Sequence, residues 1–251
     1  MAKRPAALVT GGSRGIGAAT VLALARRGHD VALTFHNKHS RADEVAAAAR
    51  RCGARALTIG GDMTLPADQT TLVQQICAWP GQLDALVLNA SGGLERDRLA
   101  GDPDYALHIN RDAQLALVDR LLPLLADSGT LVFVTSHWAH LYGRVEQLPG
   151  YEPVARSKHA GEQALRERQA EFAAAGVRLV VVSGDLVSGT ITPRLLERAA
   201  PGLSAARREQ TGALPSAEEM GEAIARAVTD RTLPSGATIV VGGSLDGLLS
   251  S

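Results

Sequence analysis

The 251-residue sequence has little that would direct it to a membrane, to nucleic acid or to export. No stretch approaches 18 uninterrupted apolar residues, and the apolar run within MAKRPAALVTGG is too short for a signal peptide. Lys plus Arg and Asp plus Glu number 26 each, so no net field favours nucleic acid or an anionic membrane surface. We therefore expect a cytoplasmic protein that acts on a small molecule, with no nucleic-acid or membrane partner.

Cysteines and aromatic residues are also scarce. The two cysteines, Cys52 and Cys77, have no CxxC spacing and no histidine cluster nearby, which predicts reduced structural thiols. The carboxylates and histidines lack the paired spacing of metal ligands, so we expect no metal site. Aromatic residues make up 3% of the chain, and composition therefore does not dictate a large flat pocket.

Short apolar runs alternate regularly with longer segments of helical period that are rich in alanine, arginine and glutamate. The runs are AALVT, DVALTF, ARALTIG, DALVLN, GTLVFVTS, VRLVVVSG and ATIVVGG. Apolar strands separated by helices predict an α/β fold, in which a doubly wound parallel sheet (a Rossmann fold) has helices on both faces. The length favours a single domain over residues 1–251, with a helical segment near 192–215 that could cover a substrate.

A glycine-rich stretch, LVTGGSRGIG, follows the first expected strand. It places Gly11, Gly15 and Gly17 before a helix that we expect to begin near Ile16. Glycines let the backbone approach a phosphate, and a pyrophosphate is stabilised at a helix N-terminus. Tight turns of purely structural purpose use the same residues, but the position after the first strand favours a dinucleotide cofactor.

The spacing TGxxxGxG resembles that of the short-chain dehydrogenase/reductase family, and the resemblance covers nearly the whole chain. Asp62 follows the third expected strand, NASG at 89–92 follows the fourth, and Ser136 follows the fifth. The resemblance implies that Asp62 caps an adenine pocket and that the turn at 89–92 lines the cofactor. The second asparagine that is usual in this turn is absent here.

The segment VVSGDLVSGTIT stands where the family has a Pro-Gly turn and a threonine that touch the nicotinamide carboxamide. Ser183 replaces the proline, Gly184 keeps the turn, and either Ser188 or Thr190 supplies the hydroxyl. Asp185 is unusual at this place. It either binds a polar or cationic substrate or caps the helix that follows.

Charge at the end of the second expected strand indicates which nicotinamide cofactor binds. An NAD-selective site presents a carboxylate there, which would repel a 2′-phosphate, but residues 34–38 include no acid. Unless Arg14 and Lys38 are simply solvated cations, they can form charge-assisted hydrogen bonds to a phosphate. We therefore expect NADP(H). The expected cofactor-binding residues are Gly11, Ser13, Arg14, Gly15, Ile16, Gly17, His36, Asn37, Lys38, Asp62, Met63, Asn89, Ala90, Ser91, Gly92, Lys158, Gly184, Ser188 and Thr190.

The resemblance also implies a catalytic set of asparagine, serine, tyrosine and lysine, which Asn110, Ser136 and Lys158 match in part. The usual tyrosine, one helical turn before the lysine, is Val154, which carries no proton. Tyr151 is the expected replacement, on the loop before a helix that begins near Pro153. A tyrosine seven residues before a lysine is also the arrangement of the enoyl-acyl-carrier-protein reductase branch.

Other proton donors and functions stay open at this point. His137, His140 and Tyr142 lie in the loop that precedes Tyr151 and could donate a proton instead. The expected function is NADP(H)-dependent hydride transfer to or from a carbonyl or alcohol, with an enoyl-type C=C reductase and a non-catalytic NADP(H)-binding regulator as alternatives. GATIVVGGS resembles the final strand that the family uses in subunit contacts, which implies a homo-oligomer, either a dimer or a homotetramer.

Overall fold

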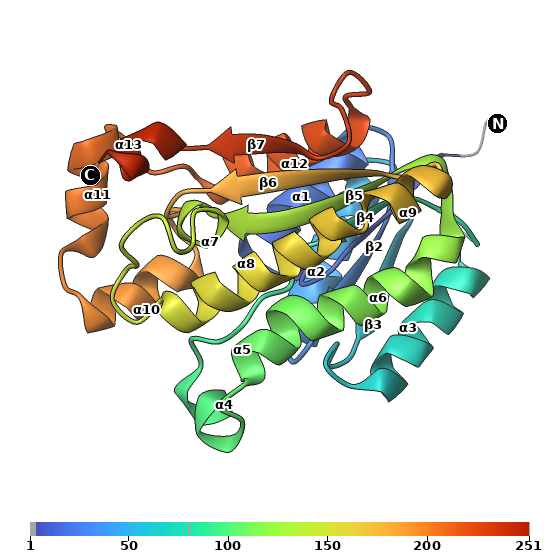
Figure 1. Cartoon of the computed structure of the whole chain (residues 1–251). Coiled ribbons are helices and arrows are strands. Elements are labelled where there is room, and N and C mark those ends of the chain that lie inside the picture. The colour runs from blue at the N-terminus through green and yellow to red at the C-terminus, as the bar shows by residue number, and fades with distance from the viewer. Residues whose placement is uncertain (1–3, 80, 251) are drawn as a thin grey trace.

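The structure, a computed structural model, describes residues 4–79 and 81–250. Across this part of the chain, seven parallel strands form one sheet in the order β3-β2-β1-β4-β5-β6-β7 (Figure 1). The strands are β1 (Ala6–Val9), β2 (Asp30–Phe35), β3 (Ala56–Gly60), β4 (Leu83–Leu88), β5 (Leu125–Ser136), β6 (Arg178–Gly184) and β7 (Ala237–Val241). Each corresponds to one of the seven apolar runs, and the predicted doubly wound α/β fold is confirmed.

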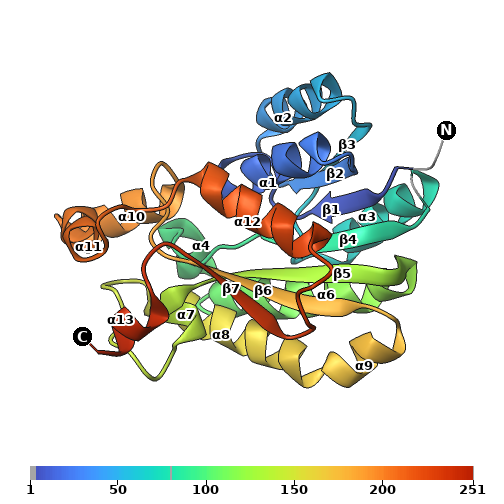
Figure 2. The same cartoon turned by 90° about the horizontal axis from the view of Figure 1, so that it is seen from above.

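Helices cover both faces of the sheet. Figure 2 shows α1, α2 and α12 on one side and α6, α8 and α9 on the other. The α-helices are α1 (Gly15–Arg26), α2 (His39–Arg51), α3 (Pro66–Ala78), α4 (Arg96–Gly101), α5 (Tyr105–Leu107), α6 (Ala113–Leu121), α7 (His137–His140), α8 (Glu152–Glu167), α9 (Gln169–Ala174), α10 (Ile191–Ala199), α11 (Leu203–Thr211), α12 (Ala217–Thr229) and α13 (Leu245–Leu249). A π-helical turn (His108–Asp112) and a 3₁₀ turn (Leu122–Leu124) flank α6.

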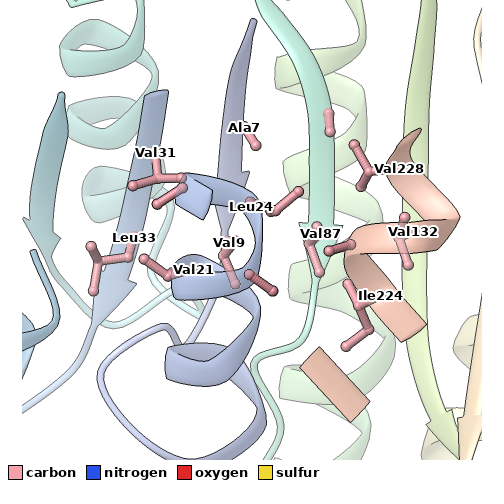
Figure 3. Packing of buried hydrophobic residues seen from close by; sticks show 14 of the residues in the cluster. Ala7, Val9, Val21, Leu24, Val31, Leu33, Val87, Val132, Ile224 and Val228 are labelled. Atoms are coloured by element: carbon pink, nitrogen blue, oxygen red, sulfur yellow. The ribbon is translucent and has the colours of Figure 1, made fainter. Parts of the chain in front are cut away.

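Two hydrophobic cores hold these layers together. Successive side chains of a strand point to opposite faces, so strands such as β1, β4, β5 and β6 contribute to both cores. On one face Val9, Leu33 and Val87 pack with Leu24 of α1 and Ile224 of α12 (Figure 3). The core on the other face includes Leu8, Leu86, Leu117, Phe133 and Leu165. Because both faces are buried, the strands are almost continuously apolar in sequence.

The helical segment between β6 and β7 lies at the end of the sheet where the strands finish (Figure 1). It comprises α10 and α11, and we call residues 191–211 the covering segment. The sequence predicts a helical segment near 192–215, and its covering of a substrate stays a prediction. Helix α12 begins at Ala217 after an N-cap, Ser216, whose side chain accepts from the Glu219 amide. This placement puts the covering segment beside the edge at which open α/β sheets bind ligands.

Both cysteines are free thiols, but Cys52 and Cys77 are exposed at the surface and do not belong to the cores. None of the described helices has the length and apolarity needed to cross a membrane. Within residues 4–79 and 81–250, no group of three or more His, Cys, Asp or Glu residues is arranged to hold a metal ion.

Candidate functional site

A cavity of about 860 Å³ opens at the carboxyl ends of the strands. Every residue expected at the cofactor lines it except Ser188. The Ser188 hydroxyl instead donates to the Pro215 carbonyl at 3.1 Å, in the connection to α12. Thr190 does line the cavity, and its hydroxyl donates to the Val187 carbonyl at 2.8 Å. Of the two hydroxyls considered from sequence, Thr190 is therefore the one placed at the cavity.

The glycine-rich loop between β1 and α1 is shaped as a backbone cradle. Gly11 and Gly15 have φ values of 67° and 51°, in the left-handed region that favours glycine. A Cβ at Gly17 would lie 2.2 Å from the Gly11 carbonyl oxygen and 2.6 Å from Asn89 Nδ2, so no side chain fits there. Asn89 Nδ2 donates to the Thr10 carbonyl at 2.9 Å and braces the loop from β4. This cradle, at the N-terminus of α1, fits the pyrophosphate of a dinucleotide.

Asp62 lies two residues after β3 and lines the cavity, and its role at an adenine stays a prediction. Its Oδ1 accepts from the backbone N and the hydroxyl of Thr64 at 3.0 and 2.7 Å. Burial raises the pKa of this carboxyl, but the Thr64 hydrogen bonds, with His36 and Arg98 nearby, outweigh burial and leave the pKa lowered. Asp62 is therefore a carboxylate at neutral pH.

Arg98 of α4 is a cavity residue that sequence reasoning missed. One Nη lies 3.5 Å from Asp62 Oδ2, and the other lies 3.2 Å from His36 Nε2. Its guanidinium also lies 5.5 Å from the ring centre of Tyr105. These contacts join segments far apart in the chain, and no local pattern around Arg98 indicated them.

Three exposed cations line the cavity beside the end of β2: Arg14, Lys38 and Arg41. Within the described residues, none of them forms a salt bridge. Arg41 was missed from sequence, although it stands three residues after Lys38 at the start of α2, where helical spacing places it on a neighbouring surface. Residues 34–38 add no acid, so this part of the cavity is positively charged.

The opposite end of the cavity holds Ser136, Tyr151 and Lys158. The Tyr151 hydroxyl donates to Ser136 Oγ at 3.0 Å. Tyr151 is the N-cap of α8, immediately before Glu152, and it lines the cavity. Burial raises the pKa of its phenol, and the hydrogen bond to Ser136 offsets only part of that effect. Val154 lies in the same wall and carries no polar group.

Lys158 lines the same cavity as this hydroxyl pair and is buried. Its Nζ donates to the Val134 carbonyl at 2.9 Å and lies 5.8 Å from the centre of the Phe133 ring. Burial lowers the pKa of Lys158 to about 8, against the opposing charge of Glu162 one turn later in α8. The ammonium therefore predominates at neutral pH, and the amine is accessible at slightly higher pH.

Asn110 lies behind the cavity rather than in its lining. Asn110 belongs to the π-helical turn 108–112. Its Nδ2 donates to the Gly92 carbonyl at 2.9 Å and to Ser157 Oγ at 3.0 Å. A Cβ at Gly161 would lie 2.5 Å from the Asn110 carbonyl, so this glycine permits the close approach of α8. The Asn110 side chain thus joins α8 to the turn after β4. Its membership of the catalytic set stays a prediction.

The three other candidate proton donors are placed outside the cavity lining. His137 is fully buried with Nδ1 2.8 Å from Ser183 Oγ, and burial lowers its pKa to about 4, which keeps it neutral. His140 Nδ1 lies 2.8 Å from a buried carboxylate oxygen of Glu162. The Tyr142 hydroxyl donates to Glu152 at 2.7 Å at the surface. The geometry therefore favours Tyr151 over all three.

Asp185 has neither of the two roles that the sequence suggested, which were substrate binding and helix capping. Its carboxylate pairs with Arg207 of α11, with Nη2 2.8 Å from Oδ2, and both side chains are buried. It therefore neither stands free for a cationic substrate nor caps the next helix, α10, whose N-cap is Thr190.

Solved structures of similar fold match almost the whole chain. A short chain dehydrogenase from Burkholderia cenocepacia in complex with NADP has a TM-score of 0.83 and 27% identity, covering 97% of this chain and 98% of the other. The promiscuous reductase LugOII, described as catalysing keto-reduction at C1 during lugdunomycin biosynthesis, has a TM-score of 0.80 and 25% identity, covering 96% and 98%.

Relatives found by sequence include reductases of two kinds. Hydroxynaphthalene reductase arp2 of Aspergillus fumigatus is 30% identical over 201 residues, which are 78% of this chain and 71% of that protein. The 1-cyclohexenylcarbonyl-CoA reductase of Streptomyces collinus is 27% identical over 191 residues, and the match spans 74% of this chain and 65% of that enzyme. The sequence model of the short chain dehydrogenases matches residues 5–199. With its parallel sheet and its glycine cradle, the chain therefore belongs to the short-chain dehydrogenase/reductase family of oxidoreductases.

Proposed function

We propose that this protein is an NADP(H)-dependent oxidoreductase that transfers hydride to or from the carbonyl or alcohol of a small molecule. The observation that carries the proposal is the hydrogen-bonded pair of Tyr151 and Ser136, which shares one cavity with Lys158. Keto-reduction is also the reaction named for LugOII. Several apolar side chains also line the substrate end, which favours a substrate with an apolar body around its reacting oxygen. Its apolar residues include Leu94, Trp138, Val154, Leu186, Ile191 and Leu195.

The positive charge of Arg14, Lys38 and Arg41 supports NADP(H) over NAD(H), because only the former carries a 2′-phosphate at the adenosine ribose. The similar Burkholderia dehydrogenase was crystallised with NADP. The glycine cradle would hold the pyrophosphate, and Lys158 would hold the nicotinamide ribose. When bound, the cofactor supplies or accepts the hydride.

The residues at the substrate end donate and accept the proton. Reduction of a carbonyl leaves negative charge on its oxygen, which a positioned donor must neutralise. The raised pKa of Tyr151 keeps its proton at neutral pH until that charge develops, and Ser136 Oγ, 3.0 Å away, orients the phenol. The positive charge of Lys158, in the same cavity, would favour the tyrosinate that follows donation.

A C=C reductase is the second candidate, and three observations favour it. The spacing of Tyr151 and Lys158 is that of the enoyl reductase branch, and Val154 leaves the usual ketoreductase position without a hydroxyl. The relative from Streptomyces collinus is named as a reductase of 1-cyclohexenylcarbonyl-CoA. In that reaction Tyr151 would polarise a thioester carbonyl instead of protonating an alkoxide. A non-catalytic regulator is less favoured, because it has no need for a buried lysine beside two hydroxyls.

Paired substrates separate these candidates. Cyclic ketones and enoyl thioesters of matched size are incubated with NADPH, and the reduced product is identified as well as the loss of NADPH. We expect the alcohol from the ketone as the faster reaction. Faster formation of the saturated thioester would favour the second candidate, and no turnover of either class would favour the regulator. Val154→Tyr restores the usual ketoreductase position and should shift preference further towards simple ketones.

A further inference from the structure

A buried ion pair ties the covering segment to the turn that follows β6. Arg207 of α11 contacts Asp185 with Nη2 2.8 Å from Oδ2 and Nε 2.9 Å from Oδ1. The two side chains are 8% and 0% exposed, whereas the other arginines of α10 and α11 are exposed. This paired geometry is the one in which a guanidinium recognises a carboxylate most specifically.

Three separate segments converge on this pair. The Asp185 carboxylate also accepts from the backbone N of Leu186 at 2.7 Å and of Gly243, after β7, at 3.0 Å. The Arg207 guanidinium lies 5.1 Å from the ring centre of Trp138 in α7. A Cβ at Gly243 would lie 2.7 Å from Asp185 Oδ2 and 2.9 Å from Arg207 Nη2. Each hydrogen-bonding direction of the carboxylate is thus occupied by a protein group, which is what a buried charge requires.

Asp185 lines the substrate end of the cavity, whereas its partner Arg207 does not. Asp185 directly follows Gly184, and both line the cavity, as does Trp138. The covering segment contributes Ile191 and Leu195 to the same cavity. If Arg207 lost its charge, Asp185 would remain as an unneutralised carboxylate close to the oxygen on which negative charge develops. Water or movement of the segment would have to compensate.

We propose that Arg207 is a positioning residue whose charge neutralises Asp185, holds the covering segment against the substrate end, and keeps this carboxylate away from the substrate. The inference rests on the proposed function for the identity of the substrate end. The ion pair itself can be tested without turnover.

The test compares Arg207→Met with Arg208→Met, which alters the next, exposed arginine of the same helix. Hydrogen exchange of residues 191–211 is measured by mass spectrometry, with NADPH affinity and, for a ketone substrate, KM and kcat. We expect Arg207→Met to exchange at least about tenfold faster in this segment and to raise KM about tenfold, with a smaller fall in kcat. NADPH affinity should change less than about threefold, because the glycine cradle and the cations at β2 are untouched. Arg208→Met should behave as wild type.

A double variant distinguishes charge neutralisation from packing. Asp185→Asn with Arg207→Met removes both charges but keeps an oxygen that accepts from the Gly243 amide, so it should recover most of the exchange protection and of KM. The inference would be overturned if residues 191–211 of Arg207→Met exchanged hydrogen as slowly as in wild type. It would also be overturned if they exchanged as fast in the double variant as in Arg207→Met. If Arg207→Met does not fold, the same comparison is made with Asp185→Asn alone against the double variant. Absence of any turnover in wild-type protein would count against the proposed function. The hydrogen-exchange result would still show whether the ion pair holds the covering segment in place.

Discussion

Removal of two cations at the end of β2 should abolish most of the preference for NADPH. Arg14 and Lys38 both line the cavity and form no salt bridge within the described residues, so a 2′-phosphate would be their principal anionic partner. A hydrogen bond to a charged group contributes about 1.5–3 kcal/mol. Because both side chains are exposed and screened by water, about 1 kcal/mol each is the appropriate magnitude.

Arg14→Ala with Lys38→Ala should therefore weaken NADPH binding by about 2 kcal/mol, or about 30-fold. NADH lacks the phosphate, so its affinity should change less than about threefold. Arg41→Ala should add a further loss of up to about fivefold for NADPH if this cation contacts the same phosphate. The preference should also fall as salt concentration rises, because exposed charges are screened.

Quenching of intrinsic fluorescence measures both affinities, and Trp138 in the cavity wall serves as a reporter. Arg51→Ala is the matched control, since Arg51 is an exposed cation in the last turn of α2 and does not line the cavity. Equal affinities in wild-type protein, or a double variant that keeps its preference, would refute the charge argument.

Three further predictions follow from burial and from the sheet edge. Wild-type protein should lose NADPH affinity as pH rises through about 8, because Lys158 then loses its proton. Lys158→Met should weaken NADPH binding and should remove this pH dependence. Titrations with NADPH at several pH values test both effects. The pKa of His137 is lowered to about 4 from 6.5, so the unfolded state binds more protons between these values and the free energy of unfolding should fall as pH drops from 6.5 to 4. His137→Asn should flatten that dependence in urea unfolding, and an unchanged slope would contradict it. β7 has an exposed edge and an exposed side chain at Val240, and light scattering should give the mass of a dimer or tetramer rather than of a monomer.

The sequence was informative where function depends on local pattern. Apolar runs located all seven strands, and the signal is clearest in central strands such as β1 and β4, which are buried on both faces. The carboxyl ends of those strands then placed Gly17, Asp62 and Ser136 at one edge. Tyr151 could be placed at the start of α8 because Pro153 limits where that helix begins.

Contacts between segments distant in sequence could not be foreseen. Asp185 was assigned to a substrate or to a cap, yet its partner, Arg207, stands 22 residues later in another helix. Arg98 reaches His36 across 62 positions of sequence. The position of Ser188 depends on its pairing with the segment before α12, which local pattern does not encode. Such pairings depend on tertiary packing, and the spacing of residues along the chain does not predict them.

The most direct test of the account is the turnover of Tyr151→Phe. This change removes one hydroxyl, which donates to Ser136 Oγ at 3.0 Å, and leaves the ring in place. A general acid contributes about 10²–10⁴-fold in rate, so kcat for the preferred substrate should fall by that factor. NADPH affinity should stay within about twofold of wild type, because the phenol does not belong to the cofactor-binding set. Tyr142→Phe, which removes an exposed hydroxyl bonded to Glu152, should retain full activity as the matched control. Full activity in Tyr151→Phe would contradict the assignment of Tyr151 as the proton donor.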